Sequence, residues 1–143
     1  GRGTVLRDDP RLTARAGDGT DLPHQPLRVV VGTGDLPEGA HILDDAAPTL
    51  HVRSRQPADV LAALAERGAV DVLLEGGPTL AGAFLAAGLV DRVLAYVAPS
   101  FLGGGPCAVG YAGVLTITAA HQFTVEQATM SGKDVRVSAI PVR

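Results

Sequence analysis

Short apolar runs that alternate with helical patterns constrain this fold more than any other feature of the sequence. Apolar runs at residues 27–34, 49–54, 70–74 and 91–99 read as strands, and the first of them, LRVVVGTG, suits a strand buried on both faces. Helical patterns occupy 56–68 and 78–88, each opened by a proline and closed by a glycine. This order predicts an α/β fold whose strands pair mostly in parallel, flanked by helices.

The last part of the chain has a different period. Apolar and polar residues alternate on both sides of Ser131-Gly132-Lys133, which predicts a C-terminal antiparallel hairpin. No internal repeat or linker interrupts the 143 residues, so the pattern indicates one domain over 1–143. The opening stretch GRGTVLRDDPRLTAR starts neither a strand nor a helix, and its Asp8-Asp9-Pro10 suits a turn.

Composition and charge exclude several kinds of partner. A net charge of −3 without a basic cluster, and 3% aromatic residues, argue against nucleic acid. No apolar run has the length of a membrane span. The four histidines stand apart and there is one cysteine, so we expect no metal site and a reducing, cytoplasmic compartment.

Glycines follow three of the predicted strands, in VVVGTG, LLEGGP and VAPSFLGGGP. If these strands are parallel, their carboxyl ends meet at one edge of the sheet, where α/β proteins bind ligands. A single glycine pair is better explained by a tight turn or a helix stop, but three at one edge favour nucleotide binding. Gly77-Pro78-Thr79 also begins a helix, whose free N–H groups attract anions.

Two charged residues have both a ligand-binding and a structural interpretation. Glu75 follows a predicted strand and either accepts hydrogen bonds from a ligand or only favours the next helix; we favour the ligand. Arg15 is either a surface charge or the fork that binds a sugar phosphate. Composition does not decide between these two for Arg15.

Two motifs, GTVLRDDPRLTAR at 3–15 and LLEGGPTLAGAFL at 73–85, resemble the reductase domain of bacterial riboflavin biosynthesis. That domain is the C-terminal half of a bifunctional pyrimidine deaminase/reductase and has a dihydrofolate-reductase-like fold. The resemblance implies reduction of the ribosyl group of 5-amino-6-(5-phosphoribosylamino)uracil by NADPH. It also implies a homodimer, and a domain whose first strand and helix precede residue 1.

The resemblance assigns roles to residues of both motifs. The implied substrate contacts are Leu12, Arg15 and Glu75. The implied cofactor contacts are Thr4, Asp8, Gly77, Pro78, Thr79, Leu80, Ala81, Gly82 and Ala83. No proton donor is identified. The alternatives are a reductase of the same fold that acts on a pterin or another pyrimidine, and a nucleotide-binding module without catalysis.

Overall fold

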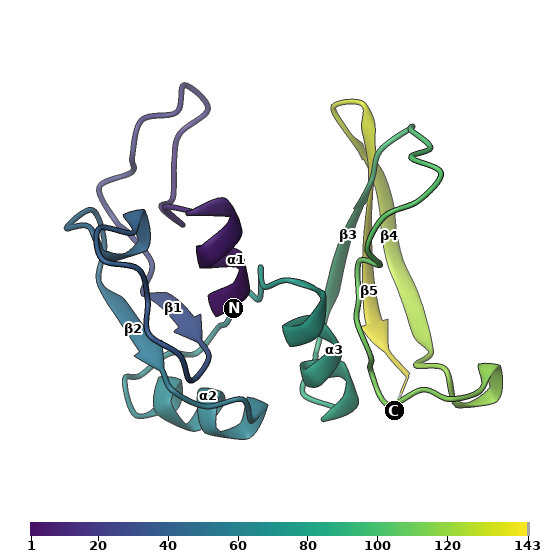
Figure 1. The fold of residues 1–143 in the computed structure, drawn as a ribbon. Coiled ribbons are helices and arrows are strands. Elements are labelled where there is room, and N and C mark those ends of the chain that lie inside the picture. Colours follow the sequence, from purple (N-terminus) through teal and green to yellow (C-terminus); the bar gives the residue numbers. More distant parts are fainter. Residues whose placement is uncertain (143) are drawn as a thin grey trace. The chain divides into compact units, whose positions relative to one another are not determined.

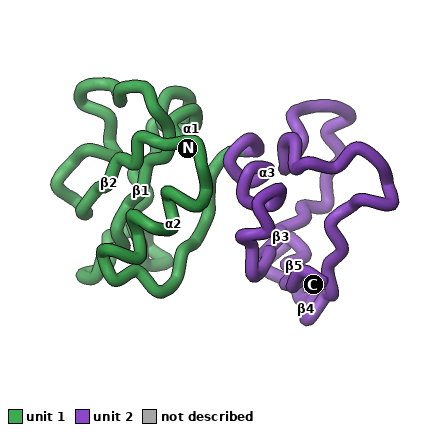
Figure 2. The backbone as a smooth tube through the Cα atoms, turned by 90° about the horizontal axis from the view of Figure 1, so that it is seen from below, with its two compact units in different colours: residues 1–77 green, residues 78–143 purple. Residues whose placement is uncertain are grey.

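A computed structural model describes residues 1–142 of the chain. The chain forms two compact units, Gly1–Gly77 and Pro78–Arg143, which Figure 2 distinguishes by colour.

The first unit contains a small parallel sheet, as the sequence predicts. Its elements are α1 (Arg2–Asp8), β1 (Arg28–Val31), η1 (His41–Leu43), β2 (Thr49–Val52) and α2 (Pro57–Ala65); Figure 1 labels its strands and α-helices. Strands β1 and β2 pair in parallel, in a register that runs from Arg28 opposite Thr49 to Val31 opposite Val52. Helix α2 begins at Pro57, the favoured first position, and buries Val60 and Leu64.

The opening stretch differs from the prediction, because residues 2–8 form a helix. Val5 of this helix is buried in a cluster with Val30, Ala40 and Ile42, against which Leu12 also packs. The turn predicted at Asp8-Asp9-Pro10 is replaced by the end of this helix: Asp8 is its last residue, and Asp9 ends it in the left-handed conformation, with its N–H donating to the Val5 carbonyl. Burial of one apolar residue therefore stabilises a helix that the local sequence alone does not indicate.

A buried arginine connects β1 to the loop between η1 and β2. The Arg28 side chain is fully buried and forms an ion pair of 2.8 Å with Asp44 Oδ1. It also donates to Thr49 Oγ1 and to four backbone carbonyls, those of Arg11, His41, Asp44 and Ala47. A buried guanidinium needs acceptors for its five N–H groups, and this loop provides them together with the Arg11 and His41 carbonyls and the Thr49 hydroxyl.

The Arg28–Asp44 pair makes stability depend on pH in a defined range. Two hydrogen bonds lower the pKa of the Asp44 carboxyl below its ordinary value. The bond from Arg28 has the larger effect, and the bond from the Ala46 N–H has the smaller one. The stabilisation is therefore complete above the ordinary aspartate pKa of about 3.9, and is lost as the pH falls through the lowered value. We expect the difference in unfolding free energy between the wild type and Asp44→Asn to be constant near neutrality and to shrink below about pH 4.

Urea unfolding at a series of pH values measures this difference. Asp45→Asn is the matched control, because Asp45 is the exposed neighbour of Asp44. A wild-type to Asp44→Asn difference that stays constant into acid would contradict the prediction.

The strand predicted at residues 70–74 is wrong. The structure has no strand there, and Val70 and Leu73 are 92% and 73% exposed. A strand needs a neighbour for its backbone N–H and C=O groups, and β1 and β2 pair with each other only. An apolar run shows that a segment favours burial, but it does not supply the partner strand.

The second unit is built on an antiparallel sheet. Its elements are α3 (Pro78–Ala86), β3 (Val93–Val97), η2 (Ile117–Ala119), β4 (Phe123–Ser131) and β5 (Asp134–Pro141), and the strand order is β3-β5-β4 (Figure 1). The C-terminal hairpin is confirmed, with Ser131 opposite Asp134 and Gly132 at φ 62° in the turn.

Strand β3 corrects the expectation of mostly parallel pairing. It is antiparallel to β5, with Val93 opposite Ala139 and Val97 opposite Val135. The hairpin strand β5 thus takes the position that the prediction assigned to a parallel neighbour. The α/β class is confirmed, but within the described residues parallel pairing is limited to β1 and β2.

Helix α3 packs directly against the backbone of residues 110–111. The Gly110 N–H donates to the Pro78 carbonyl at 2.9 Å, and a Cβ added at Gly82 would lie 2.5 Å from the Tyr111 carbonyl oxygen. We therefore expect Gly82→Ala to destabilise the chain by about 1–3 kcal/mol, although alanine favours a helix by about 1 kcal/mol.

Urea unfolding measures the effect of Gly82→Ala. Gly104→Ala is the control, because a Cβ at Gly104 would meet nothing within 4 Å. An increase in stability for Gly82→Ala would show that residues 110–111 do not lie against the helix in solution.

Candidate functional site

Helix α1 presents two of the expected cofactor contacts on one face. Thr4 and Asp8 are four residues apart, a spacing that places both side chains on the same side of a helix. Thr4 is half-buried, and Asp8 is exposed in the last turn. The helix that the sequence did not predict is therefore what aligns these two residues.

Gly77 lies against the same face of α1. A Cβ added at Gly77 would be 3.4 Å from Thr4 Oγ1, so the glycine leaves open space beside the hydroxyl. Residues far apart in the sequence, one from each motif, thus meet within the first unit. A hydroxyl beside an open stretch of backbone can donate and accept hydrogen bonds with a ligand.

Leu12 and Arg15 lie in the irregular segment that follows α1. Leu12 packs against the core cluster and has φ 50°, a left-handed conformation that is uncommon for leucine. Arg15 is exposed, and its backbone forms a single antiparallel bridge with Asp21. Strained backbone of this kind persists only where the surroundings hold it, and it is common at ligand sites.

Glu75 is exposed in the segment that links α2 to α3. Within residues 1–142 its carboxylate has no hydrogen bond or ion pair that would explain it as a structural residue. The position thus leaves the carboxylate free to accept hydrogen bonds from an added ligand.

The remaining expected cofactor contacts, Pro78, Thr79, Leu80, Ala81, Gly82 and Ala83, form the first turns of α3 in the second unit. N–H groups in a first helical turn have no carbonyl within the helix to bind, which makes this end suitable for an anion. Gly82 is an exception, because it is buried and its packing against residues 110–111 already explains a glycine.

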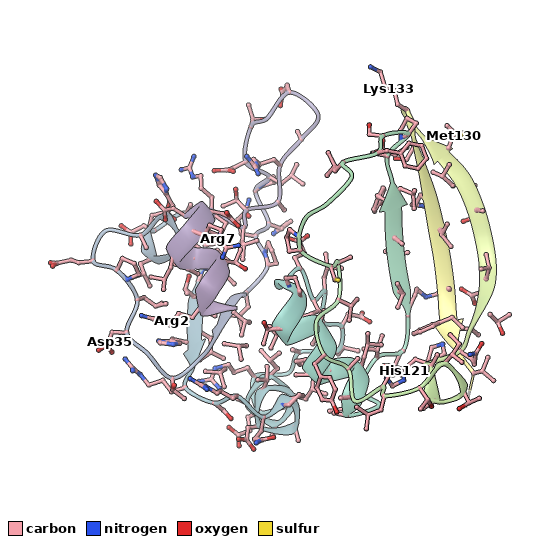
Figure 3. All side chains as sticks on the ribbon, turned by 45° about the vertical axis from the view of Figure 1, so that its right-hand side comes forward. Arg2, Arg7, Asp35, His121, Met130 and Lys133 are labelled. Carbon is pink, nitrogen blue, oxygen red and sulfur yellow. The ribbon has the colours of Figure 1, made fainter. Side chains whose placement is uncertain are left out.

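The glycines after β1 do not form the expected phosphate site. A Cβ at Gly32 would lie 2.9 Å from Arg2 Cβ, and one at Gly34 would lie 2.8 Å from Arg2 Cζ. The Arg2 side chain fills this space and donates to the Asp35 carbonyl at 2.8 Å; Figure 3 labels both residues. The convergence of three glycine-ended parallel strands is also wrong, because 70–74 is not a strand and β3 is antiparallel.

Sequence interpretation missed the contact between Asp9 and His41. Asp9 Oδ1 accepts from the His41 N–H at 2.9 Å, and Asp9 Oδ2 lies 2.7 Å from His41 Nδ1. These contacts attach the end of α1 to η1. Nothing in the local sequence signals a pairing between residues 32 positions apart.

Residues 1–142 contain no group of three or more His, Cys, Asp or Glu side chains placed to hold a metal ion. None of their helices has both the length and the apolar character needed to cross a membrane.

Comparison with solved structures defines the class of fold. The chain superimposes on RibD of Acinetobacter baumannii with a TM-score of 0.80 and 29% sequence identity, over 98% of this chain and 45% of that one. The fold is that of a dihydrofolate-reductase-like α/β domain. The chain belongs to the RibD C-terminal domain family, whose model matches residues 1–137.

Curated relatives agree with this assignment. The riboflavin biosynthesis protein RibD of Mycobacterium tuberculosis is 53% identical over 140 residues, which are 98% of this chain and 41% of that protein. A 2,5-diamino-6-ribosylamino-4(3H)-pyrimidinone 5′-phosphate reductase of Archaeoglobus fulgidus is 35% identical over 73% of this chain and 62% of that protein. The chain thus spans about two fifths of the length of the RibD relative.

Proposed function

We propose that the chain is a reductase domain that converts the ribosyl group of 5-amino-6-(5-phosphoribosylamino)uracil to a ribityl chain with NADPH. Membership of the RibD C-terminal domain family supports this proposal. The observation that carries it is the meeting of the two motifs, Thr4 against Gly77, within one unit. Substrate residues Leu12, Arg15 and Glu75 belong to the same unit.

In our proposal NADPH binds beside Thr4, Asp8 and Gly77 of the first unit. Thr4 and Asp8 offer a hydroxyl and a carboxylate on one helix face, and the open backbone at Gly77 allows a close approach. Within the second unit, the first turn of α3 has N–H groups that suit an anion, and Thr79 is exposed there. NADPH, when bound, supplies the hydride.

The chain's own residues have to hold the sugar open and orient it. Reduction needs the ribosyl ring opened, so that C1′ becomes electrophilic. In our proposal Arg15 binds the 5′-phosphate with its planar fork, Glu75 accepts hydrogen bonds from the substrate, and Leu12 packs against it. Such positioning lowers the barrier because it removes the entropy cost of bringing two reactants together.

The direct test is oxidation of NADPH by the complete polypeptide that contains residues 1–143. We expect the absorbance of reduced nicotinamide to fall when the ribosylaminouracil phosphate is added, and the ribityl product to form in equal amount. Tight NADPH binding without oxidation by any heterocycle would instead favour a nucleotide-binding module.

The Archaeoglobus relative supports a second candidate substrate. That protein is named as a reductase of a diaminopyrimidinone ribosyl phosphate, which has an amino group where the uracil has an oxygen. Parallel assays with the two phosphorylated pyrimidines separate the candidates by their kcat/KM values. We expect the uracil compound to be preferred, and a preference for the diamino compound would replace our first candidate. Oxidation with a pterin alone would exclude both.

Gly77→Ala tests the cofactor part of the proposal. A methyl group 3.4 Å from Thr4 Oγ1 is in ordinary contact, so we expect the fold to tolerate it. The same methyl group fills the space beside the hydroxyl, and we expect it to raise the KM for NADPH about tenfold or more with little change in stability. Gly17→Ala is the control, because a Cβ at Gly17 would meet nothing within 4 Å. An unchanged KM for NADPH would remove Gly77 from the cofactor site.

We also propose that residues 1–143 act as one reductase domain, that the protein is a homodimer and that it works in the cytoplasm. The single cysteine supports a reducing compartment. Sedimentation equilibrium of the complete polypeptide tests the dimer, since a mass of one chain at micromolar concentration would exclude it.

A further inference from the structure

Side chains of two residues hold the segment that contains Leu12 and Arg15. At its start, Arg28 donates to the Arg11 carbonyl at 3.1 Å. Near its end, Gln25 Oε1 accepts from the Ala14 N–H at 2.8 Å, and Gln25 Nε2 donates to the Ala14 carbonyl at 2.9 Å. Arg11 is the neighbour of Leu12, and Ala14 is the neighbour of Arg15. The backbone beside each substrate candidate is therefore held by a hydrogen bond from Arg28 or Gln25.

Gln25 acts here like a residue of a neighbouring strand. The Leu22 N–H also donates to the Ala14 carbonyl, and the Ala16 N–H donates to the Thr20 carbonyl, so residues 14–22 form a small antiparallel loop. The paired N–H and C=O of Ala14 meet the amide of Gln25 in the way that two strand residues meet. The Gln25 amide thus satisfies the backbone N–H and C=O of Ala14, as a residue of a paired strand would.

The three hydrogen bonds explain why the residue is a glutamine. Its second N–H donates to the Leu22 carbonyl at 2.7 Å, so the amide oxygen and both N–H groups are used. A glutamate could still accept from the Ala14 N–H, but it could not donate to either carbonyl. Gln25 is half-buried and lies outside the core cluster, which makes its replacement compatible with a folded chain.

We propose that Gln25 is a positioning residue that holds the backbone of Arg15 for binding of the substrate phosphate. The inference rests on the proposed function, since it takes Arg15 as the phosphate ligand. Gln25 acts only through the backbone next to Arg15 and does not touch substrate itself. Arg15 is exposed and has one backbone bridge, so without Gln25 its guanidinium samples more positions and binding loses preorganisation.

The test compares kinetic constants of Gln25→Ala and Gln25→Glu in the complete polypeptide. We expect both variants to raise the KM for the phosphorylated pyrimidine about tenfold and to leave the KM for NADPH unchanged. In an Arg15→Ala background, Gln25→Ala should add almost nothing, because the group that it positions is absent. Gln122→Ala is the control: Gln122 also donates to a backbone carbonyl, that of Ala120, but in the second unit.

The outcomes separate this inference from the proposed function. If the wild type turns over and Gln25→Ala leaves the substrate KM unchanged, or raises both KM values equally, the inference is wrong and the function stands. If the wild type does not turn over, the proposed function is wrong, and calorimetry with ribose 5-phosphate decides about Gln25. Weaker binding in Gln25→Ala than in Gln122→Ala would support the positioning role, and no binding to the wild type would overturn it.

Discussion

Replacing Arg28 by methionine is expected to lower the free energy of unfolding by about 3–5 kcal/mol. The substitution keeps much of the side chain's length but removes every donor. It leaves the carbonyls of Asp44 and Ala47, 2.6 Å and 2.5 Å from the guanidinium, without that partner, and it breaks the ion pair with Asp44. The expected loss of stability comes mainly from buried carbonyls left without a hydrogen bond, and less from the lost ion pair.

The control for Arg28→Met is the same substitution at an exposed pair. Arg53 and Asp35 form an ion pair of 2.6 Å, but their side chains are 56% and 88% exposed. We expect Arg53→Met to change the unfolding free energy by less than about 1 kcal/mol. Urea unfolding with both variants provides the comparison, and equal effects would show that burial does not determine the importance of Arg28.

Arg15→Ala is expected to raise the KM for the phosphorylated pyrimidine about ten- to a hundredfold. A hydrogen bond to a charged group contributes about 1.5–3 kcal/mol, and about 1.4 kcal/mol corresponds to a factor of ten. Because Arg15 is exposed and outside the core, the loss should appear in substrate binding and not in stability. Steady-state kinetics with each substrate varied in turn measure it.

Two further variants test why Arg15→Ala raises the KM for the phosphorylated pyrimidine. Arg15→Lys keeps the charge but loses the planar fork, so it should restore only part of the affinity. Arg67→Ala removes a positive charge from the turn after α2, where Arg67 donates to the Ala63 carbonyl, and should leave both KM values unchanged. An equal rise in KM for Arg67→Ala would indicate a general effect of charge.

Local patterns predicted the elements whose signals lie within a few residues. Helix α2 and the C-terminal hairpin both follow from such signals: Pro57 with an apolar face, and alternation around Gly132. Helix α1 was missed because its stability depends on Val5 meeting Val30 and Ile42, which are far away in the sequence. The strand at 70–74 was predicted wrongly for the converse reason, since its apolar residues lack a pairing partner.

The candidate site likewise has residues that the sequence predicts and residues that it does not. Motif residues could be chosen from the sequence, and Thr4 and Gly77 do lie together. The roles assigned to the individual site residues remain predictions. The contacts that hold the motifs, between Asp9 and His41 and between Ala14 and the Gln25 side chain, have no motif of their own, because a side chain bound to a distant residue leaves no local pattern.

The Arg28 guanidinium also sets how β1 and β2 align. Arg28 and Thr49 are direct partners in the parallel pair, Arg28 Nε donates to Thr49 Oγ1 at 3.0 Å, and Thr49 Oγ1 in turn donates to the Ile42 carbonyl. Sliding one strand by a single residue would turn its side chains to the other face, so that Arg28 and Thr49 would no longer face each other and the buried guanidinium would lose this acceptor. One arginine in an otherwise apolar strand thus favours a single alignment of β1 with β2, because other alignments leave its buried guanidinium without this hydrogen bond.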